Sequence, residues 1–379
     1  MVFLGLFLPT LFAFYFLANN TARPYVLLVF SLLFYAWGEP VYIALLIVST
    51  LANYLLGLLV RTPDGAQRKP ALVAAIILNL AFLGIFKYAD MAVSTLNALV
   101  GASIPLPGIA LPLGISFYTF QALSYVIDVY RGECEPQRSY PRVLLYISFF
   151  PQLVAGPIVK YHDISGQIDD RRCTPEQTAA GIRRFVRGLG KKVLIADSVG
   201  YLADVVFSDC LHGVYGAPDI RLMWLGVLCY TLQIYYDFSG YSDMAIGLGR
   251  MLGFEFLENF NYPYISRSIR DFWRRWHISL SSWFREYLYI PLGGNRKGKL
   301  RTALNKLLVF FCTGIWHGAN WTFVLWGLGH GLLASLEDSG LIPVEKLRRS
   351  TPGRVLCRIY TLLAVALLFA IFRADNLRD

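Results

Sequence analysis

Apolar segments of about the length that crosses a lipid bilayer recur along the first third of the chain, and they restrict the fold more than any motif does. In chain order they are Met1–Leu17, Val26–Trp37, Val41–Val60, Ala71–Phe86 and Leu113–Tyr130. A helix needs roughly 20 apolar residues to span the hydrocarbon core, whereas a membrane strand needs only about 10. The segment lengths therefore predict an all-α, polytopic integral membrane protein.

The composition excludes an ordinary soluble domain. Hydrophobic residues make up 56% of the 379 residues and charged residues only 16%, whereas about a quarter of a soluble domain is charged. The first segment has no basic residues before it and no small-residue cleavage site, so we expect a membrane helix and not a signal peptide. The six cysteines form no CxxC pair, so we expect neither a zinc site nor a disulfide framework.

Basic residues gather between the apolar segments. The basic stretches are Arg61–Lys69, Arg131–Arg142, Lys160–Lys192, Arg267–Arg301 and Lys346–Arg358. The net charge of +10 would suggest nucleic acid as the partner of a soluble protein, but basic loops of a membrane protein lie on the cytoplasmic side. We therefore expect contact with membrane lipid and no nucleic-acid partner. Counting back from Arg61 through three spans places the N-terminus outside.

Two apolar stretches are interrupted. The piece VLLYISFFPQLVAGPIV, residues 143–159, is too short to cross twice and contains two prolines and a glycine, which predicts a re-entrant segment lining a cavity. Leu222–Phe256 is interrupted by YYDFSGYSDMAIG, which carries Asp237 and Asp243. Such carboxylates cost about 2.5–3.5 kcal/mol in a membrane. Either they face a polar path inside the bundle, or they lie in a polar turn at the interface.

Two further elements follow from pattern. Apolar residues recur every three or four positions in the stretch YISRSIRDFWRRWHISLSSWFREYLYIPLGGNRKGK, with arginines and serines on the other face. This periodicity predicts one amphipathic helix at the membrane interface. Its apolar positions are Trp273, Trp276, Leu280, Trp283, Phe284 and Tyr287. Ala303–Ser335 is long enough for a helical hairpin, and we expect its turn at HGAN.

Histidines are the candidate chemical groups. His317 lies in GIWHGANW, beside small residues and between tryptophans. An imidazole can take a proton from a hydroxyl near neutral pH, although a membrane histidine can equally hydrogen-bond between helices. His277 could orient His317, bind substrate or lie at the lipid headgroups. We expect His162 and His212 to be solvated in polar loops, and His330 to pack between helices. No HxH, HExxH or GxSxG pattern occurs, so we expect neither a metal site nor an acyl-serine intermediate.

Four motifs, in order, resemble the membrane-bound O-acyltransferase family. They are FPQLVAGPIV, YYDFSGYSDMAIGLGRMLGF, FNYPYISRSIRDFWRRWHISLSSWFREYLYIPLGGNRKG and GIWHGANWTFVLWGLGHG. Within the family the chain is most similar to the bacterial membrane subunits that O-acetylate alginate, and it is also similar to D-alanyl-lipoteichoic-acid exporter subunits. The resemblance covers nearly the whole chain. It implies helices around a central tunnel, in a bacterial inner membrane with the N-terminus on the periplasmic side.

The resemblance also implies roles for residues. His317 and His277 match the two active-site positions of the family. No cofactor is expected; the implied donor is a cytoplasmic thioester, acetyl-CoA, whose phosphates the basic residues Arg267, Arg270, Arg274, Arg275 and Lys297 attract. The residues expected to contact substrate are Trp316, Asn320, Asp237, Ser239, Trp276, Arg274 and Arg275.

We expect a single domain over residues 1–379. It comprises N-terminal spans at 1–130, a catalytic core at 131–340, and a final loop and span at 341–379, after which relatives continue with further helices. The implied partners are periplasmic acetyltransferase proteins and a polysaccharide acceptor, alginate being the first choice. Peptidoglycan, cellulose and D-alanyl transfer stay open, as do an export channel and a non-catalytic scaffold.

Overall fold

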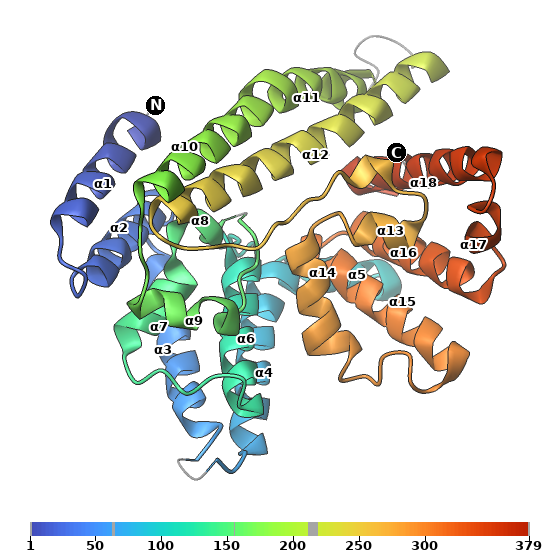
Figure 1. Ribbon diagram of the computed structural model, residues 1–379. Coiled ribbons are helices and arrows are strands. Elements are labelled where there is room, and N and C mark those ends of the chain that lie inside the picture. The colour runs from blue at the N-terminus through green and yellow to red at the C-terminus, as the bar shows by residue number, and fades with distance from the viewer. Residues whose placement is uncertain (1, 63–64, 155, 211–218, 378–379) are drawn as a thin grey trace. The chain divides into compact units, whose positions relative to one another are not determined.

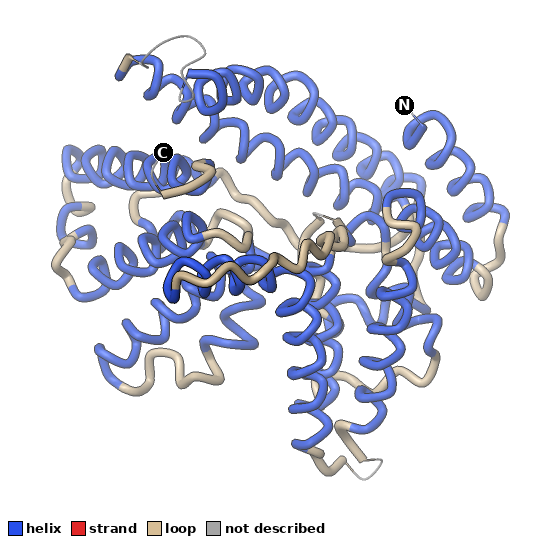
Figure 2. The backbone as a smooth tube through the Cα atoms, turned by 180° about the vertical axis from the view of Figure 1, so that it is seen from behind, coloured by secondary structure: helices blue, strands red, loops and turns tan. Residues whose placement is uncertain are grey.

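The computed structural model describes residues 2–62, 65–154, 156–210 and 219–377. Over these ranges helices joined by loops form the fold without a strand (Figures 1 and 2), which confirms the all-α prediction. The chain divides into two compact units. Unit 1 is Met1–Ile182 with Ala245–Phe256, and unit 2 is Arg183–Met244 with Leu257–Asp379.

Unit 1 contains the apolar segments of the first third of the chain, and each of them is helical. Its helices are η1 (Phe3–Phe7), α1 (Leu8–Leu17), α2 (Arg23–Gly38), α3 (Ile43–Leu59), α4 (Lys69–Leu83), η2 (Gly84–Tyr88), α5 (Ala89–Val100), α6 (Ile115–Arg131), α7 (Tyr140–Ser148), α8 (Phe150–Leu153) and α9 (Tyr161–Asp169). Two helical stretches in the described chain, Lys69–Val100 and Thr351–Arg373, are long and apolar enough to cross a membrane, and three shorter apolar helices precede them. This supports the membrane assignment.

A buried amide pair joins two of these helices. Asn53 of α3 and Asn79 of α4 are both buried, and each donates its side-chain amide to the other, at 3.3 and 2.6 Å. Polar side chains that bond across helices in this way are typical of membrane bundles, where no water is available to satisfy them.

The predicted break in the segment 143–159 is present. α7 ends at Ser148, α8 covers only Phe150–Leu153, and the chain from Gly156 to Lys160 is irregular and buried. Side chains satisfy part of this backbone: Tyr146 Oη donates to the carbonyl of Val159 at 2.8 Å, and Gln152 Nε2 donates to the carbonyl of Tyr146 at 2.6 Å. Re-entry into the membrane stays a prediction, and Ala155 lies outside the described residues.

Two long helical stretches contribute to both units. The first is α10 (Pro175–Gly190), continued by η3 (Lys191–Ala196), α11 (Asp197–Asp204) and η4 (Val205–Cys210); the second is α12 (Ile220–Met251). The polar interruption expected within Leu222–Phe256 is wrong, because α12 continues through it for 32 residues. Glycines let the helices approach within unit 2, since a Cβ atom on Gly188 would meet the carbonyl oxygen of Gly240.

Unit 2 continues with shorter elements and a hairpin. They are η5 (Pro263–Ile265), α13 (Ile269–Trp273), α14 (Ile278–Phe284), η6 (Arg285–Tyr289), α15 (Gly298–His317), α16 (Trp321–Ser339), α17 (Val344–Leu347) and α18 (Thr351–Arg373). α15 and α16 form the predicted hairpin, with its turn at Gly318–Asn320. The hairpin packs closely because Gly327 faces the carbonyl oxygen of Phe310, where a Cβ atom would collide.

The single interfacial helix predicted around residues 267–289 is wrong. His277 has φ 44° and ψ 56°, so the chain breaks there into α13 and α14. The preceding loop explains the break: Ile278 N donates to the carbonyl of Asn259 at 2.9 Å, and Asn261 N donates to the carbonyl of Arg275 at 2.9 Å. The apolar positions are still used, but Trp276 and Leu280 are buried within unit 2.

Candidate active site

His317 is the last residue of α15, where the hairpin turns. Three rings surround its imidazole: Trp316 at 5.0 Å, Trp326 edge-on at 5.1 Å and Phe372 at 5.2 Å between ring centroids. The imidazole itself is half-buried. The flanking tryptophan Trp321, in contrast, is exposed. The aromatic frame limits the orientations that His317 can adopt.

His277 lies beside His317, with 6.4 Å between the two ring centroids. It is 1% exposed, and neither ring nitrogen has a hydrogen-bond partner among the residues that the structure describes. Burial, and then the charge of His317, hold the pKa of His277 well below its usual value, so its imidazole is neutral at pH 7. A buried residue with unsatisfied nitrogens and a positive φ is costly to the fold, and such residues cluster at functional sites.

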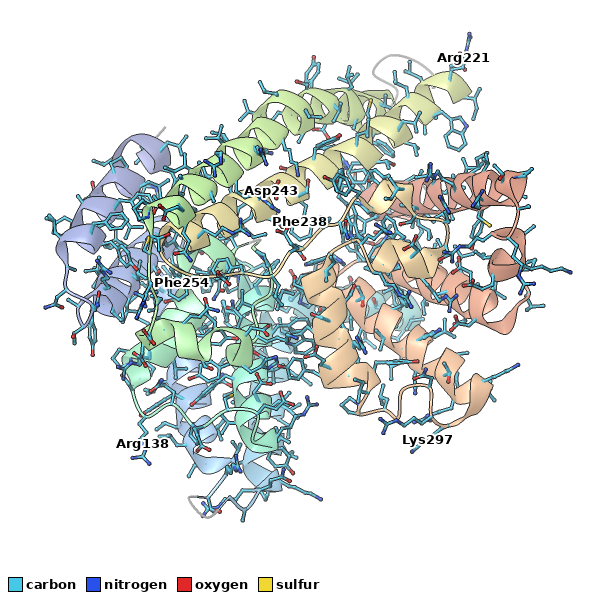
Figure 3. The ribbon with its side chains drawn as sticks, in the orientation of Figure 1. Arg138, Arg221, Phe238, Asp243, Phe254 and Lys297 are labelled. Carbon is cyan, nitrogen blue, oxygen red and sulfur yellow. The ribbon has the colours of Figure 1, made fainter. Side chains whose placement is uncertain are left out.

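Three of the expected substrate residues border this pair or lie close to it in the chain. Trp316 is buried, and its ring centroid is 6.0 Å from that of His277. Phe238 of α12 (Figure 3) contacts His277 edge-on at 4.6 Å. The next residue, Ser239, has a buried hydroxyl without a hydrogen-bond partner among the described residues. Trp276 is 3% exposed and packs in the aromatic core of unit 2.

The two carboxylates of α12 are ion-paired. Asp243 (Figure 3) forms ion pairs with Arg184 at 2.6 Å and Lys191 at 2.7 Å. Asp237 forms an ion pair with Lys192 at 2.9 Å. The interpretation as a polar turn is therefore wrong, since the cations of a neighbouring helical stretch neutralise the acids and α12 stays intact. Asp237 is not left open to a ligand in this arrangement.

Asn320 is similarly engaged. Its Oδ1 accepts from the backbone N–H of Thr322 at 3.2 Å and so caps α16, while its Nδ2 donates to the carbonyl of Asp375 at 2.8 Å. An asparagine at this position satisfies one of the free N–H groups at a helix start. The capping bond fixes the turn that follows His317.

A pocket of about 270 Å³ opens in unit 2, and its wall contains chain neighbours of both histidines but neither histidine itself. Thr313, which lines it, precedes His317 by one helical turn on α15, about 6 Å along the axis. Leu280, also in its wall, follows His277 by three residues. Its cations are Arg270, Arg274, Arg285 and Lys306, and its rings are Trp273, Phe284, Tyr289 and Phe310.

The cations of this pocket differ in their pairing. Arg270 pairs with Asp338 at 3.0 Å and Glu345 at 2.7 Å, and Lys306 also pairs with Asp338. Arg274 and Arg285 are exposed and have no ion-pair partner among the residues that the structure describes. Arg285 was not expected at the site, although its place on the polar face with Arg274 and Ser281 pointed toward it. Arg275, which was expected there, pairs with Asp271 at 3.0 Å.

The remaining histidines lie elsewhere. His330 is fully buried against Trp273 and Trp326, in agreement with a packing role. The expectation of a solvated His162 is wrong, because its Nδ1 lies 3.0 Å from Oδ2 of the buried Asp128. His212 lies outside the described residues.

Comparison with known proteins gives a consistent assignment. The sequence model of the membrane-bound O-acyltransferase (MBOAT) family matches residues 136–342, which include both candidate histidines. The chain is similar to the probable alginate O-acetylase AlgI of Pseudomonas putida, with 44% identity over 99% of this chain and 77% of that protein. It is 37% identical to the peptidoglycan O-acetyltransferase of Helicobacter pylori, over 100% of this chain and 77% of that protein. The teichoic acid D-alanyltransferase of Bacillus subtilis is 30% identical over 68% of this chain and 65% of its own length.

Proposed function

The chain belongs to the membrane-bound O-acyltransferase family, and we propose that this O-acyltransferase moves an acetyl group from cytoplasmic acetyl-CoA across the bacterial inner membrane to a polysaccharide. Alginate is the proposed acceptor, because the relatives at 43–44% identity are named as alginate O-acetylases. The N-terminus is proposed to be periplasmic, which puts the basic loops on the donor side.

The observation that carries the proposal is the histidine pair, His277 and His317, with 6.4 Å between its ring centroids. The pocket is one layer of side chains away from it. Thr313 lies in the pocket wall one helical turn before His317. Trp273, also in the wall, contacts Trp326 at 5.7 Å, and Trp326 contacts His317 at 5.1 Å. We propose that a donor seated in this pocket extends its thioester past Trp326 toward His317.

The charge and polarity of the pocket suit a thioester donor with phosphates. Arg274 and Arg285 have free guanidinium groups, which bind phosphate oxygens well because they present parallel N–H donors. The aromatic wall beyond them offers an apolar surface to the rest of the donor. Arg275, Asp237 and Asn320 would contact substrate only after exchanging their present partners.

The reaction needs one general base. His317 accepts the proton of an acceptor hydroxyl, and the oxygen attacks the carbonyl carbon of the thioester. The carbon–sulfur bond then breaks, an acetyl ester forms, and the proton returns from His317 to the departing thiolate. The products are the O-acetylated acceptor and free CoA.

His277 is proposed to stabilise the charge that develops in this step. Its imidazole is neutral and carries an N–H group for which the described residues supply no acceptor. A fixed donor in a site without water stabilises a developing oxyanion strongly. We propose that Trp316 and Trp276 shape the cavity around this donor, and that the Ser239 hydroxyl contacts the substrate.

The acceptor is proposed to receive the acetyl group with the help of periplasmic acetyltransferase proteins. Relatives named for peptidoglycan and teichoic acid make other cell-envelope acceptors, and a D-alanyl donor, the outcomes that a test must separate. An export channel or an inactive scaffold would leave acetyl transfer independent of His317.

The test uses inverted membrane vesicles that contain the wild-type chain, His317→Ala or the control Trp321→Phe. Acetyl-labelled CoA is added outside, and alginate with a periplasmic extract is enclosed. Label should reach the enclosed polymer with the wild type and with Trp321→Phe, but not with His317→Ala. Equal labelling by all three would refute the mechanism. Labelling of enclosed peptidoglycan but not of alginate would change the acceptor.

A further inference from the structure

A second cluster of titratable groups lies in unit 1, and the proposed reaction does not use it. It comprises Asp128 near the end of α6, Glu133 just after α6, and His162 and Asp163 at the start of α9. The Asp128 side chain is fully buried, whereas the Glu133 side chain is 42% exposed and connects the cluster to solvent. A buried carboxylate needs a compensating cation.

Three candidate ligand atoms converge in this cluster. His162 Nδ1 lies 3.0 Å from Asp128 Oδ2 and 3.5 Å from Glu133 Oε2, and the ligand atoms of the three residues lie within 4.8 Å of one another. In a tetrahedral zinc site with bonds of about 2.0–2.1 Å, ligand atoms are separated by about 3.3 Å. The 3.0 and 3.5 Å separations from Nδ1 lie on either side of this value, so small side-chain movements would let Nδ1 and one oxygen of each carboxylate bind one ion, with water as a fourth ligand.

The other ring nitrogen of His162 has a partner of its own. Nε2 lies 3.2 Å from Oδ1 of Asp163, so this carboxylate accepts the Nε2–H bond. Metal-binding histidines commonly donate their second N–H to a carboxylate, which fixes the tautomer and makes the first nitrogen a better ligand. With the proton on Nε2, a lone pair on Nδ1 faces the oxygens of Asp128 and Glu133, which is repulsive unless a cation lies between them.

Two cations border the cluster. Lys160 approaches the far oxygen of Asp163 at 3.9 Å, and Arg131 approaches the far oxygen of Glu133 at 3.7 Å. A second proton on the imidazole and a metal ion are two ways to place positive charge between Nδ1 and the oxygens of Asp128 and Glu133.

We propose that Asp128, Glu133 and His162 bind a divalent transition-metal ion of the zinc class, with Asp163 orienting the imidazole. The imidazole ligand favours zinc over magnesium or calcium, which prefer oxygen ligands alone. The site joins the end of α6 to the start of α9, on the chain that leaves the segment 143–159. It is independent of the proposed acetyl transfer, so neither proposal depends on the other.

The experiment measures metal binding by the full chain in detergent micelles after removal of metal with EDTA. Co²⁺ is the spectroscopic probe, and Zn²⁺ is the competitor. One equivalent of Co²⁺ should give the intense visible absorption of a four- or five-coordinate ion, and one equivalent of Zn²⁺ should abolish it. Zn²⁺ should also raise the thermal unfolding temperature, because an ion that binds only the folded state stabilises it.

Variants separate the metal from the proton. His162→Gln and Glu133→Gln should abolish the Co²⁺ spectrum, whereas Asp163→Asn should weaken Co²⁺ binding about 10- to 100-fold. Glu135→Gln, an exposed carboxylate close in the chain, is the matched control and should bind like the wild type. Glu133 is half-exposed, so Glu133→Gln should fold even if variants at the buried Asp128 do not. Absence of the spectrum in the wild type, or its survival in both ligand variants, would mean that the charge is a proton.

Discussion

The polar groups of unit 2 fall into two opposite classes, those with a partner and those without one among the described residues. The carboxylates of α12 are matched to cations: Asp243 has two, and Asp237 has one. The imidazole of His277, in contrast, is buried and has no hydrogen-bond partner in the described part of the chain. An unsatisfied buried group costs about 1–3 kcal/mol. The carboxylates therefore connect helices, whereas the imidazole beside His317 is the group that we propose to contact the substrate.

The strongest test of this contrast is His317→Ala. Removal of the proposed general base should lower the acetyl-transfer rate about 10³-fold, equivalent to about 4 kcal/mol in the barrier. The unfolding temperature should change little, since His317 is only half-buried. Initial rates of label transfer and thermal unfolding in micelles measure the two effects. A rate within tenfold of the wild type would remove His317 from the chemistry.

Asp243→Ala should give the opposite result. It leaves Arg184 and Lys191 without their shared partner, although Arg184 retains Glu258. Because both cations are partly exposed, we expect a loss of about 2–3 kcal/mol in unfolding free energy, which is less than for a fully buried pair. The unfolding temperature should fall by several degrees, while the transfer rate per folded molecule stays the same. Loss of rate at unchanged stability would place Asp243 in the site instead.

His277 tests both sides of the contrast at one position. Its φ of 44° is unfavourable for alanine but tolerated by asparagine. His277→Asn should therefore have a free energy of unfolding about 1 kcal/mol higher than that of His277→Ala, and it should unfold at a higher temperature. Both variants should reduce transfer, by 10- to 100-fold for alanine and less for asparagine, whose amide can still donate a hydrogen bond. Equal stability of the two variants would show that the backbone relaxes when histidine is removed.

The sequence predicted those parts of the fold that depend on local pattern. The apolar helices of unit 1 and the α15–α16 hairpin follow from segment length and from the small residues at its turn. Family resemblance implied that His277 and His317 act in one site, and the structure brings their rings together.

Features created by distant partners could not be predicted in this way. The break at His277 depends on backbone hydrogen bonds to Asn259 and Asn261. The carboxylates of α12 are neutralised by Arg184 and Lys192, which lie on a separate helical stretch. His162 was expected to be solvated because it lies in a polar stretch. Its partner, Asp128, lies on another helix, so the local sequence did not reveal the contact. In each case a long-range hydrogen bond or ion pair overrides the local periodicity, which by itself contains no information about the partner.

Among the cations of unit 2, Arg274 and Arg285 belong with His277, on the unpartnered side of this contrast. Since neither has an ion-pair partner in the described part of the chain, their replacement should affect donor binding more than folding. The double variant Arg274→Gln, Arg285→Gln should raise the KM for acetyl-CoA about tenfold with kcat nearly unchanged. The salt dependence of KM should also become weaker. Arg275→Gln, at an arginine already paired with Asp271, is the matched control and should leave KM within twofold. A larger effect of the control would mean that the phosphates bind elsewhere.

The smallest effect is expected at Asp237, where the pairing with Lys192 is most exposed to water. Both side chains are about 40% exposed, and Lys192 also pairs with Asp197 at 2.9 Å, so it keeps a partner when Asp237 is changed. Exposed ion pairs contribute about 0–1 kcal/mol. Asp237→Asn should therefore shift the unfolding temperature by no more than one or two degrees and leave the transfer rate within twofold. A tenfold loss of rate at unchanged stability would instead make Asp237 a substrate contact, and the paired carboxylates of α12 would no longer form one structural class.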